Sequence, residues 1–296
     1  MRDLLLSATA VDSGIAIYAA VTTDLVAEIA RRHDLSPTAT AAVGRLATGA
    51  VLLGANLKGR ERISLQISGD GPIRALTADA WLLDDATIGV RGYAHNGQVD
   101  VPLSPRGKFD VAGAIGDGVL QVTKSYEVGQ PYAGVVPLHS GEIAEDVAAY
   151  LLQSEQIPSV VALGVLANPD GIVAAGGIIA QVLPGADEAA TERLERRALA
   201  MPPVTTLIAR WADAHQLLRE IAGDVELRAP RSMGMRFDCL CTKAKVEVAL
   251  TGLGRAELER MEQAHDETEA TCEFCRRVYA LSKPEIRALI DRLEEA

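Results

Sequence analysis

The chain is 296 residues long, which is enough for two domains and a substantial buried core. Apolar residues make up 48% of it but aromatic residues only 4%, so the core should consist mainly of Ala, Val, Leu and Ile. The formal net charge of −11 weighs against a nucleic-acid-binding protein, because such proteins normally carry an excess of Lys and Arg.

The N-terminal segment does not have the pattern of a signal peptide. It has an acid at Asp3 and only three consecutive leucines, Leu4–Leu6, where a signal peptide has basic residues and a longer apolar stretch. We therefore expect a cytoplasmic protein. In the reducing cytosol, cysteines serve metal binding or redox chemistry more often than structural disulfides.

Residues 1–184 predict a mixture of helices and antiparallel strands. One helix is expected over Thr23–Asp34 behind a threonine N-cap, and a second follows Ser36-Pro37 and runs to about Leu57. Gly141–Glu155 is predicted as a third helix. This order indicates the α+β class and not a doubly wound parallel sheet. Strands are expected at residues 63–67, 73–81, 88–97 and 119–126.

One apolar run, Val160–Leu183, is long enough to cross a membrane and carries a single charge, Asp170. Its middle, however, is the turn sequence Asn168-Pro169-Asp170-Gly171, which divides it into two strand-length pieces. We therefore predict a buried β-hairpin and no membrane contact.

After Pro184-Gly185 the composition changes. Asp187–Arg197 is expected to be a solvated helix, because seven of its eleven residues are charged. Met201-Pro202-Pro203 ends it, and Val204–Ile221 then carries an apolar stripe. Two interpretations stay open: ordinary amphipathic surface helices, or a linker that is ordered only by its neighbour, which would be the cysteine module. The stripe consists of Val204, Leu207, Ile208, Trp211, Leu218 and Ile221.

All four cysteines lie close to the C-terminus. Cys239 and Cys241 form a CxC pair, and Cys272 and Cys275 form a CxxC pair after the intervening residues 242–271. Two close pairs on either side of a loop supply the four tetrahedral ligands that zinc prefers. We predict one zinc ion per chain, bound by all four thiolates. Such a site has no open position for water, so hydrolytic catalysis is not expected.

The rest of the cysteine module is predicted as short elements. Lys243–Leu250 alternates like a strand, and Arg255–Ala264 resembles a short charged helix. Ser282 and Glu285 form a capping box for a last helix. His265 lies here too, but four cysteines already fill the shell. With so little apolar area, the module would depend on its metal to fold. Five basic residues either offset the charge of the site or are simply solvated: Arg236, Lys243, Lys245, Arg276 and Arg277.

Metal-bound thiolates are the oxidisable form of cysteine. Suppose that an oxidant joined Cys239 to Cys241 and Cys272 to Cys275. Neither bridge would span residues 242–271, so the module would lose a metal contribution to folding of about 10–16 kcal/mol. The freed loop would regain entropy worth about 3–4 kcal/mol. A Cys239–Cys241 bridge would also be strained, hence easily reduced, so the change should be reversible.

The CxC and CxxC pairs at the end of a chain of this length resemble those of the bacterial redox-regulated heat-shock holdases named 33 kDa chaperonin. The resemblance extends over nearly the whole chain. Further matching residues are Gly69-Asp70-Gly71-Pro72-Ile73, Tyr132, Gly134, Leu138, Ser140-Gly141-Glu142, Ser154-Glu155-Gln156, Gly176-Gly177, Gln181 and Pro184-Gly185.

This resemblance implies a cytoplasmic, ATP-independent chaperone of the stress response, not an enzyme. It implies a core domain over residues 1–184, a metastable helical linker over 185–235 and a zinc redox-switch domain over 236–296. The reduced, zinc-bound form would be an inactive monomer. Oxidation, helped by heat, would form the disulfides Cys239–Cys241 and Cys272–Cys275, release zinc and unfold the linker. The exposed apolar surface would capture unfolding client proteins, and the active form would be a homodimer.

Two other functions remain as alternatives. A zinc ribbon could bind nucleic acid, although the acidic balance of the chain weighs against it. A thiol–disulfide oxidoreductase could use Cys272 and Cys275, but this leaves the CxC pair unexplained. A nucleotide partner is not expected, because the sequence has no GxxxxGK[ST] motif.

Overall fold

The computed structural model describes residues 3–10, 13–105, 107–168 and 170–294. It divides the chain into two compact units, Met1–Asp238 and Cys239–Ala296, so that the boundary falls directly before the first cysteine. In this division residues 185–235 belong to the same unit as residues 1–184.

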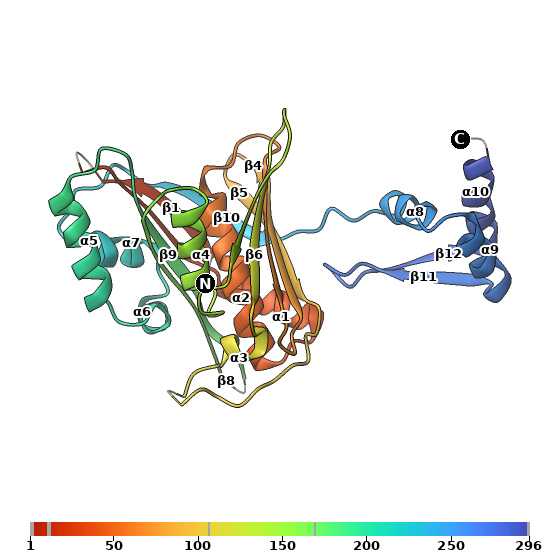
Figure 1. The fold of residues 1–296 in the computed structure, drawn as a ribbon, viewed down its shortest axis with the longest axis horizontal. Coiled ribbons are helices and arrows are strands. Elements are labelled where there is room, and N and C mark those ends of the chain that lie inside the picture. Colours follow the sequence, from red (N-terminus) through yellow and green to blue (C-terminus); the bar gives the residue numbers. More distant parts are fainter. Residues whose placement is uncertain (1–2, 11–12, 106, 169, 295–296) are drawn as a thin grey trace. The chain divides into compact units, whose positions relative to one another are not determined.

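One ten-stranded sheet organises the larger unit, with helices on both of its faces (Figure 1). Its order is β7-β6-β3-β4-β5-β10-β1-β2-β9-β8. The predicted α+β class with an antiparallel sheet is confirmed. The strands are β1 (Leu4–Thr9), β2 (Ile15–Val21), β3 (Arg62–Gly69), β4 (Ala75–Asp84), β5 (Thr87–Ala94), β6 (Gly118–Ser125), β7 (Tyr132–Pro137), β8 (Ser159–Asn168), β9 (Gly171–Val182) and β10 (Arg231–Phe237). The helices are α1 (Thr23–His33), α2 (Pro37–Leu53), α3 (Val111–Ile115), α4 (Ala144–Gln153), α5 (Glu188–Ala200), α6 (Val204–Trp211) and α7 (Ala214–Ala222).

Strand β10 joins two antiparallel halves of this sheet. It pairs antiparallel with β1, where Met233 lies opposite Leu5, and parallel with β5, where Phe237 lies opposite Val90. The sequence does not predict this strand, because its partners lie far away in the chain. The backbone N–H of Asp238 donates to the carbonyl of Val90 at 2.9 Å, so the sheet holds the chain up to the residue before the first cysteine.

The inner face of the sheet packs against α1, α2 and α4 in the main core. Helix α2 begins as predicted, with Pro37 in its first turn and the Ser36 hydroxyl accepting from the backbone N–H of Ala39 at 3.1 Å. The segment Pro37–Asn56 is long and apolar enough to cross a membrane, but 94% of its apolar window is buried inside the fold. This burial identifies it as a core helix.

The threonine cap predicted for α1 is wrong. Thr22 occupies the N-cap position but makes no capping hydrogen bond, and its hydroxyl lies 2.7 Å from that of Thr48. The carboxylate of Asp3 instead accepts from the backbone N–H groups of Asp24 and Leu25. Burial raises the pKa of Asp3 to about 6. The cap therefore comes from the start of β1 and not from the helix's own flank.

The outer face has an apolar half over β1, β2, β8 and β9, and helices α5, α6 and α7 cover it (Figure 1). Of the two interpretations that the sequence left open, ordinary amphipathic helices or a linker ordered by the cysteine module, the packing favours the first, because these helices pack on the sheet of their own unit. On the sheet side, this apolar half is formed by Leu6, Ala8, Ile17, Ala19, Val21, Ile178 and Ala180. On the helix side, the buried residues include Leu194, Val204, Leu207, Ile208, Leu217, Leu218 and Ile221.

The stripe predicted over Val204–Ile221 is buried on this half, but it lies on two helices and not on one. Ala212 adopts a left-handed conformation with φ of 51°, which ends α6. The carboxylate of Asp213 then accepts from the backbone N–H of His215 at 2.8 Å and begins α7. The break lets both short helices follow the surface of the sheet.

The other part of the outer face, over β3, β4, β5 and β6, is polar. Cross-strand partners share a face, and here Ser64 lies opposite Asp79, which in turn lies opposite Arg91. The buried Asp79 carboxylate accepts from Arg62 and from Arg91. Both guanidinium groups also flank the ring of Trp81, with centroid distances of 5.7 and 5.6 Å. This polar half therefore covers its aromatic residue with its own side chains.

The hairpin predicted within Val160–Leu183 is confirmed. It is formed by β8 and β9, which pair antiparallel from Ser159 opposite Gln181 to Asn168 opposite Gly171. Asp170 N–H donates to the side chain of Asn168, as expected for a turn, and Pro169 lies outside the described residues.

The smaller unit has a core of its own. Its elements are α8 (Lys243–Thr251), α9 (Arg255–Ala264), β11 (Glu267–Thr271), β12 (Val278–Ser282) and α10 (Lys283–Glu294). The strand predicted over Lys243–Leu250 is wrong: this segment is helical, and the hydroxyl of Thr242 caps it by accepting from the N–H of Lys245. The predicted capping box is confirmed, because Glu285 accepts from the backbone N–H and hydroxyl of Ser282. Six residues form the buried core: Leu250, Leu258, Leu281, Ile286, Leu289 and Ile290.

Candidate metal centre

Two irregular segments of the smaller unit carry the cysteines. Cys239 and Cys241 precede α8, and Cys272 and Cys275 lie in the turn between β11 and β12. That turn is closed by backbone hydrogen bonds, from Cys272 N–H to the Arg277 carbonyl at 2.9 Å and from Arg276 N–H to the Cys272 carbonyl at 2.8 Å. Arg276 adopts a positive φ of 59°. The turn brings both of its thiols to the same side as the CxC pair.

The four sulfurs converge on one point. All four lie within 4.8 Å of one another, and none of them forms a disulfide bond. Cys239 Sγ is 3.8 Å from Cys272 Sγ, and Cys241 Sγ is 3.3 Å from Cys275 Sγ. Sulfurs bound at about 2.3 Å to a tetrahedral zinc ion lie about 3.8 Å apart, whereas a disulfide bond is about 2.05 Å long. The arrangement therefore fits a metal bound by four thiolates.

Hydrogen bonds make the two nearest thiols electrostatically unlike. Burial acts to raise the pKa of Cys241, but hydrogen bonds from Tyr279 and from the neighbouring thiols outweigh it and lower the pKa to about 7. Burial raises the pKa of Cys275 to about 12. Cys241 is thus the thiol that loses its proton more easily, and a bound cation would favour the thiolate form of both.

Tyr279 is a site residue that sequence reasoning missed. Its phenol lies 3.1 Å from Cys241 Sγ and donates a hydrogen bond to it, and the Arg277 side chain is hydrogen-bonded to the same phenol. Tyr279 lies in β12, and Arg277 directly precedes this strand, so the spacing of two residues was the signal in the sequence that could have suggested their contact.

The five basic residues that either offset the site charge or are simply solvated have different partners. Lys245 donates to the Leu240 carbonyl at 2.6 Å, beside the CxC pair. Lys243 pairs with Glu285 at 2.5 Å, and Arg276 pairs with Glu273 at 3.5 Å. Arg277 reaches the sulfurs through Tyr279. Arg236 belongs to the larger unit, and His265 is not among the residues of the sulfur cluster.

Comparisons with known proteins cover the whole chain. A family model described as "Hsp33 protein" matches residues 3–282. The "33 kDa chaperonin" of Desulforamulus reducens is 40% identical over 296 residues, which are 100% of this chain and 99% of that protein. The "33 kDa chaperonin" of Bacillus subtilis is 40% identical over 292 residues, or 98% of this chain and 99% of the relative. A crystal structure of the 33 kDa chaperonin from Thermotoga maritima has a TM-score of 0.91 at 34% identity and covers 100% of both chains.

Proposed function

Since the chain belongs to the Hsp33 family of chaperones, we propose that it is a redox-regulated, ATP-independent holdase. The observation that carries this proposal is the convergence of four cysteine sulfurs within 4.8 Å, with no disulfide between them, in a small unit that follows directly on a strand of the main sheet. Such a cluster can hold the unit together in one oxidation state and release it in the other.

In the reduced protein, Cys239, Cys241, Cys272 and Cys275 bind one zinc ion. The ion supplies a cross-link between two segments that residues 242–271 separate in the chain. The chain's own residues arrange this cross-link: the β11–β12 turn presents one pair of thiols, and the segment before α8 presents the other. Tyr279 orients Cys241 through its hydrogen bond.

A peroxide converts the four thiols into two disulfides, Cys239–Cys241 and Cys272–Cys275. Each bond forms as two thiolates give up two electrons to hydrogen peroxide, whose O–O bond breaks, and two protons from the solvent complete two molecules of water. Disulfide sulfur no longer serves as an anionic ligand. Because both bridges are local, nothing then links the two segments covalently or through a metal. The small core of α8, α9 and α10 loses about 10–16 kcal/mol of metal-dependent folding energy.

The loss of structure in the smaller unit is transmitted to the larger unit through β10. Cys239 follows Asp238, whose N–H is the last backbone hydrogen bond of that strand to β5. When the residues after Asp238 lose their structure, β10 frays from this end, and the chain between α7 and β10 is freed from the sheet.

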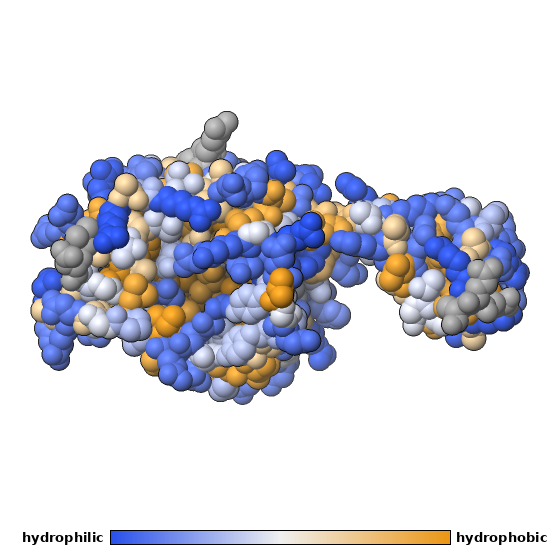
Figure 2. All heavy atoms as spheres, turned by 90° about the horizontal axis from the view of Figure 1, so that it is seen from above, coloured by the Kyte–Doolittle hydropathy of each residue, from blue (hydrophilic) through white to orange (hydrophobic). Residues whose placement is uncertain are grey.

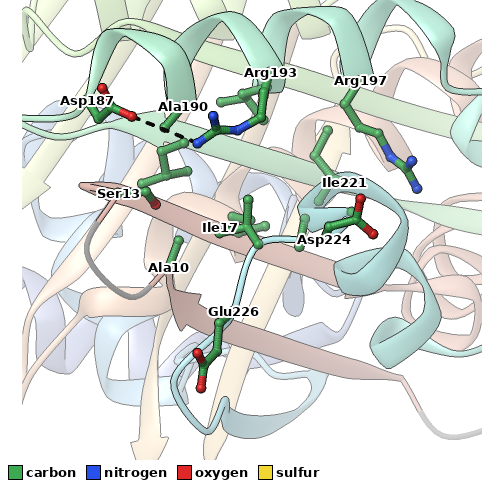
Figure 3. A pocket seen from close by; sticks show the side chains of 15 residues that line it. Ala10, Ser13, Ile17, Asp187, Ala190, Arg193, Arg197, Ile221, Asp224 and Glu226 are labelled. Carbon is green, nitrogen blue, oxygen red and sulfur yellow. Dashed lines mark ion pairs between the residues drawn. The ribbon is translucent and has the colours of Figure 1, made fainter.

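Helices α5 and α7 are suited to release, because an open pocket lies where they meet β2 (Figure 3). A cavity of about 480 Å³ lies between β2, α5 and the segment after α7, and Ile17 and Ala190 line it. Ser13 on its wall is 7% exposed, and its hydroxyl has no hydrogen-bond partner among the described residues. An unpaired buried hydroxyl lowers the stability of the docked helices. These features support a metastable linker over residues 185–235.

The surface that captures clients is then the apolar half of the sheet. Leu6, Ile17 and Ile178 lie on it and are at most 2% exposed while the helices cover them. In the view of Figure 2, apolar residues of the larger unit are visible only in gaps between hydrophilic ones. Removing three helices would replace these gaps with one continuous apolar area, which can bind unfolding chains in the cytoplasm without a nucleotide. Two such areas would also favour a homodimer of the oxidised form.

The decisive experiment measures aggregation of a heat-unfolded client by light scattering, without ATP. The reduced, zinc-loaded protein should not suppress aggregation, and the protein treated with peroxide at mild heat should suppress it in stoichiometric amounts. Zinc released per chain and peptide mapping of the disulfides are followed in the same samples. Equal suppression by the reduced protein contradicts the redox part of the proposal. Salt-sensitive polynucleotide binding, or catalytic turnover in insulin reduction, would instead favour the alternatives.

A further inference from the structure

A second cavity of the larger unit lies where α6 meets the edge of the sheet. Its volume is about 540 Å³. It is lined by the outer strand β8, by the loop that contains Lys108, by the start of α6, and by Arg45 from the core helix α2. Nothing in the redox mechanism uses this cavity.

The charged residues that line the cavity are both cationic. Arg45 and Lys108 contribute side chains to it, and the lining has no carboxylate among the described residues. Lys108 is exposed and has no acidic partner in the described part of the chain. Arg45 is paired with Glu142, which is not among the lining residues, so Lys108 supplies the unpaired positive charge of the cavity, and this charge favours a negatively charged occupant.

Arg45 is held in place but only partly paired. The residue is 8% exposed, and its Nη1 donates to the Glu142 carboxylate at 2.5 Å. Its Nε is buried and has no acceptor among the described residues. A buried donor without an acceptor costs stability, so this guanidinium is incompletely paired in the structure.

The start of α6 adds further donors on the same wall. This helix has no side-chain cap, because its N-cap residue is Pro203. The N–H groups of Thr206 and Leu207 donate back to the Pro203 carbonyl, whereas those of Val204 and Thr205 have no acceptor within the described ranges. Thr205 and Thr206 line the cavity as well. A helix start with free N–H groups favours an anion.

The remaining lining is apolar. It includes Leu103 and Leu166, which are 57% and 40% exposed, together with Phe109, Leu163 and Met201. An inorganic anion would use the cationic end and leave this apolar wall exposed to water. An apolar chain that ends in a carboxylate would use both, and guanidinium groups match the geometry of carboxylates.

We infer that this cavity binds a small organic acid with an apolar chain, with its carboxylate held between Arg45, Lys108 and the start of α6. The bound molecule ties α6 to α2 and to the Lys108 loop. It therefore favours the docked linker, since a ligand stabilises the state that binds it.

The test uses the reduced, zinc-loaded full-length protein and calorimetric titration. The probes are decanoate, decylamine and inorganic phosphate, all below the concentrations at which the amphiphiles form micelles. Decanoate should bind at one site per chain and slow hydrogen exchange in α6. Decylamine, which has the same chain and the opposite charge, should not bind. Binding of decylamine with equal affinity overturns the inference, and so does phosphate binding as tight as that of decanoate.

Variants locate the site. Arg45→Lys should weaken decanoate binding at least about tenfold, because it removes the forked donor and its charge-assisted hydrogen bonds. Lys108→Gln should weaken it by roughly threefold to fivefold, as expected for an exposed ion pair. Lys58→Gln changes an exposed lysine outside the cavity and should have no effect. Because Lys108 is exposed, its variant should fold normally, and unchanged decanoate affinity in that variant contradicts the inference even if Arg45→Lys is unstable.

Discussion

The two halves of the outer sheet face differ in what covers them. On the polar half, Arg62 and Arg91 pair with the buried Asp79 and lie against Trp81, so the sheet covers itself with side chains from its own strands. On the apolar half, Leu6, Ile17 and Ile178 have no such cover of their own and are buried by α5, α6 and α7. Helices that cover the sheet can detach from it while the sheet stays folded. Side chains of the sheet's own strands cannot.

Under the proposed function, this difference lets one sheet be stable and yet carry a covered binding surface. The polar half would stay folded in either state, because its groups already pair with one another. The apolar half would be exposed only when the helices detach. We propose that the metal centre controls that event through β10, the strand between the two halves.

The largest effect is expected from removing a ligand of the metal centre. Cys272→Ser leaves three thiols, which cannot complete the tetrahedral site, so the smaller unit should unfold and the cover should be lost without peroxide. Circular dichroism should show reduced helix content, and client aggregation should be suppressed under reducing conditions. Thr271→Ser, on the neighbouring exposed position of β11, serves as the control. Retained helix content and an inactive Cys272→Ser protein would contradict the role of the centre.

A smaller effect is expected from weakening the cover directly. Leu218 of α7 is 3% exposed on the apolar half, and its truncation to Ala should destabilise the docked helix by about 2–5 kcal/mol. The variant should be activated at lower temperature or lower peroxide concentration. Gln66→Ala, at an exposed position of the polar half, should leave activation unchanged. An equal shift in the activation of both variants would contradict the proposed difference between the apolar and the polar half of the outer sheet face.

Activation should become slower, and not faster, after a substitution at the contact between the sheet and the docked helices that Figure 3 shows. Ser13→Ala removes a buried hydroxyl without a partner, which should stabilise the docked helices by about 1–3 kcal/mol. Activation by peroxide and heat should then be slower, measured as the lag before client aggregation is suppressed. Ser64→Ala on the polar half is the matched change. Faster activation of the Ser13→Ala variant would show that this contact does not limit the release of the docked helices.

The smallest effect is expected from a substitution at the metal centre that leaves all four cysteines in place. Tyr279→Phe removes the hydrogen bond to Cys241, worth about 0.5–1.5 kcal/mol, and leaves the cover untouched. Zinc affinity, measured by competition with a chelating dye, should fall several-fold, while hydrogen exchange in α5–α7 of the zinc-saturated protein stays as it was. Tyr126→Phe, at an exposed tyrosine of the larger unit, is the control. Unchanged zinc affinity would mean that the phenol does not support the thiolate.

Local signals account for the parts of this fold that the sequence predicts. Ser36-Pro37 begins α2, the Asn168–Gly171 turn separates β8 from β9, and the spacing of the four cysteines anticipates their convergence. In each case, a few neighbouring residues determine the backbone.

Where the outcome depends on distant residues, the prediction fails. Lys243–Leu250 alternates like a strand, but Val248 is 71% exposed, so the alternation reflects no buried face. Strand β10, the Asp3 cap of α1 and the bond between Tyr279 and Cys241 all join segments far apart in the chain. No pattern within one segment contains this information.

Hydrogen exchange of the same protein before and after peroxide treatment tests the central claim most directly, with α5–α7 compared against β3 and β4. Oxidation should accelerate exchange sharply in residues 188–222 and leave residues 62–84 protected. Continued protection of residues 188–222 in protein that has lost its zinc, or an equal loss of protection in both regions, would contradict the account of a removable cover on a permanent sheet.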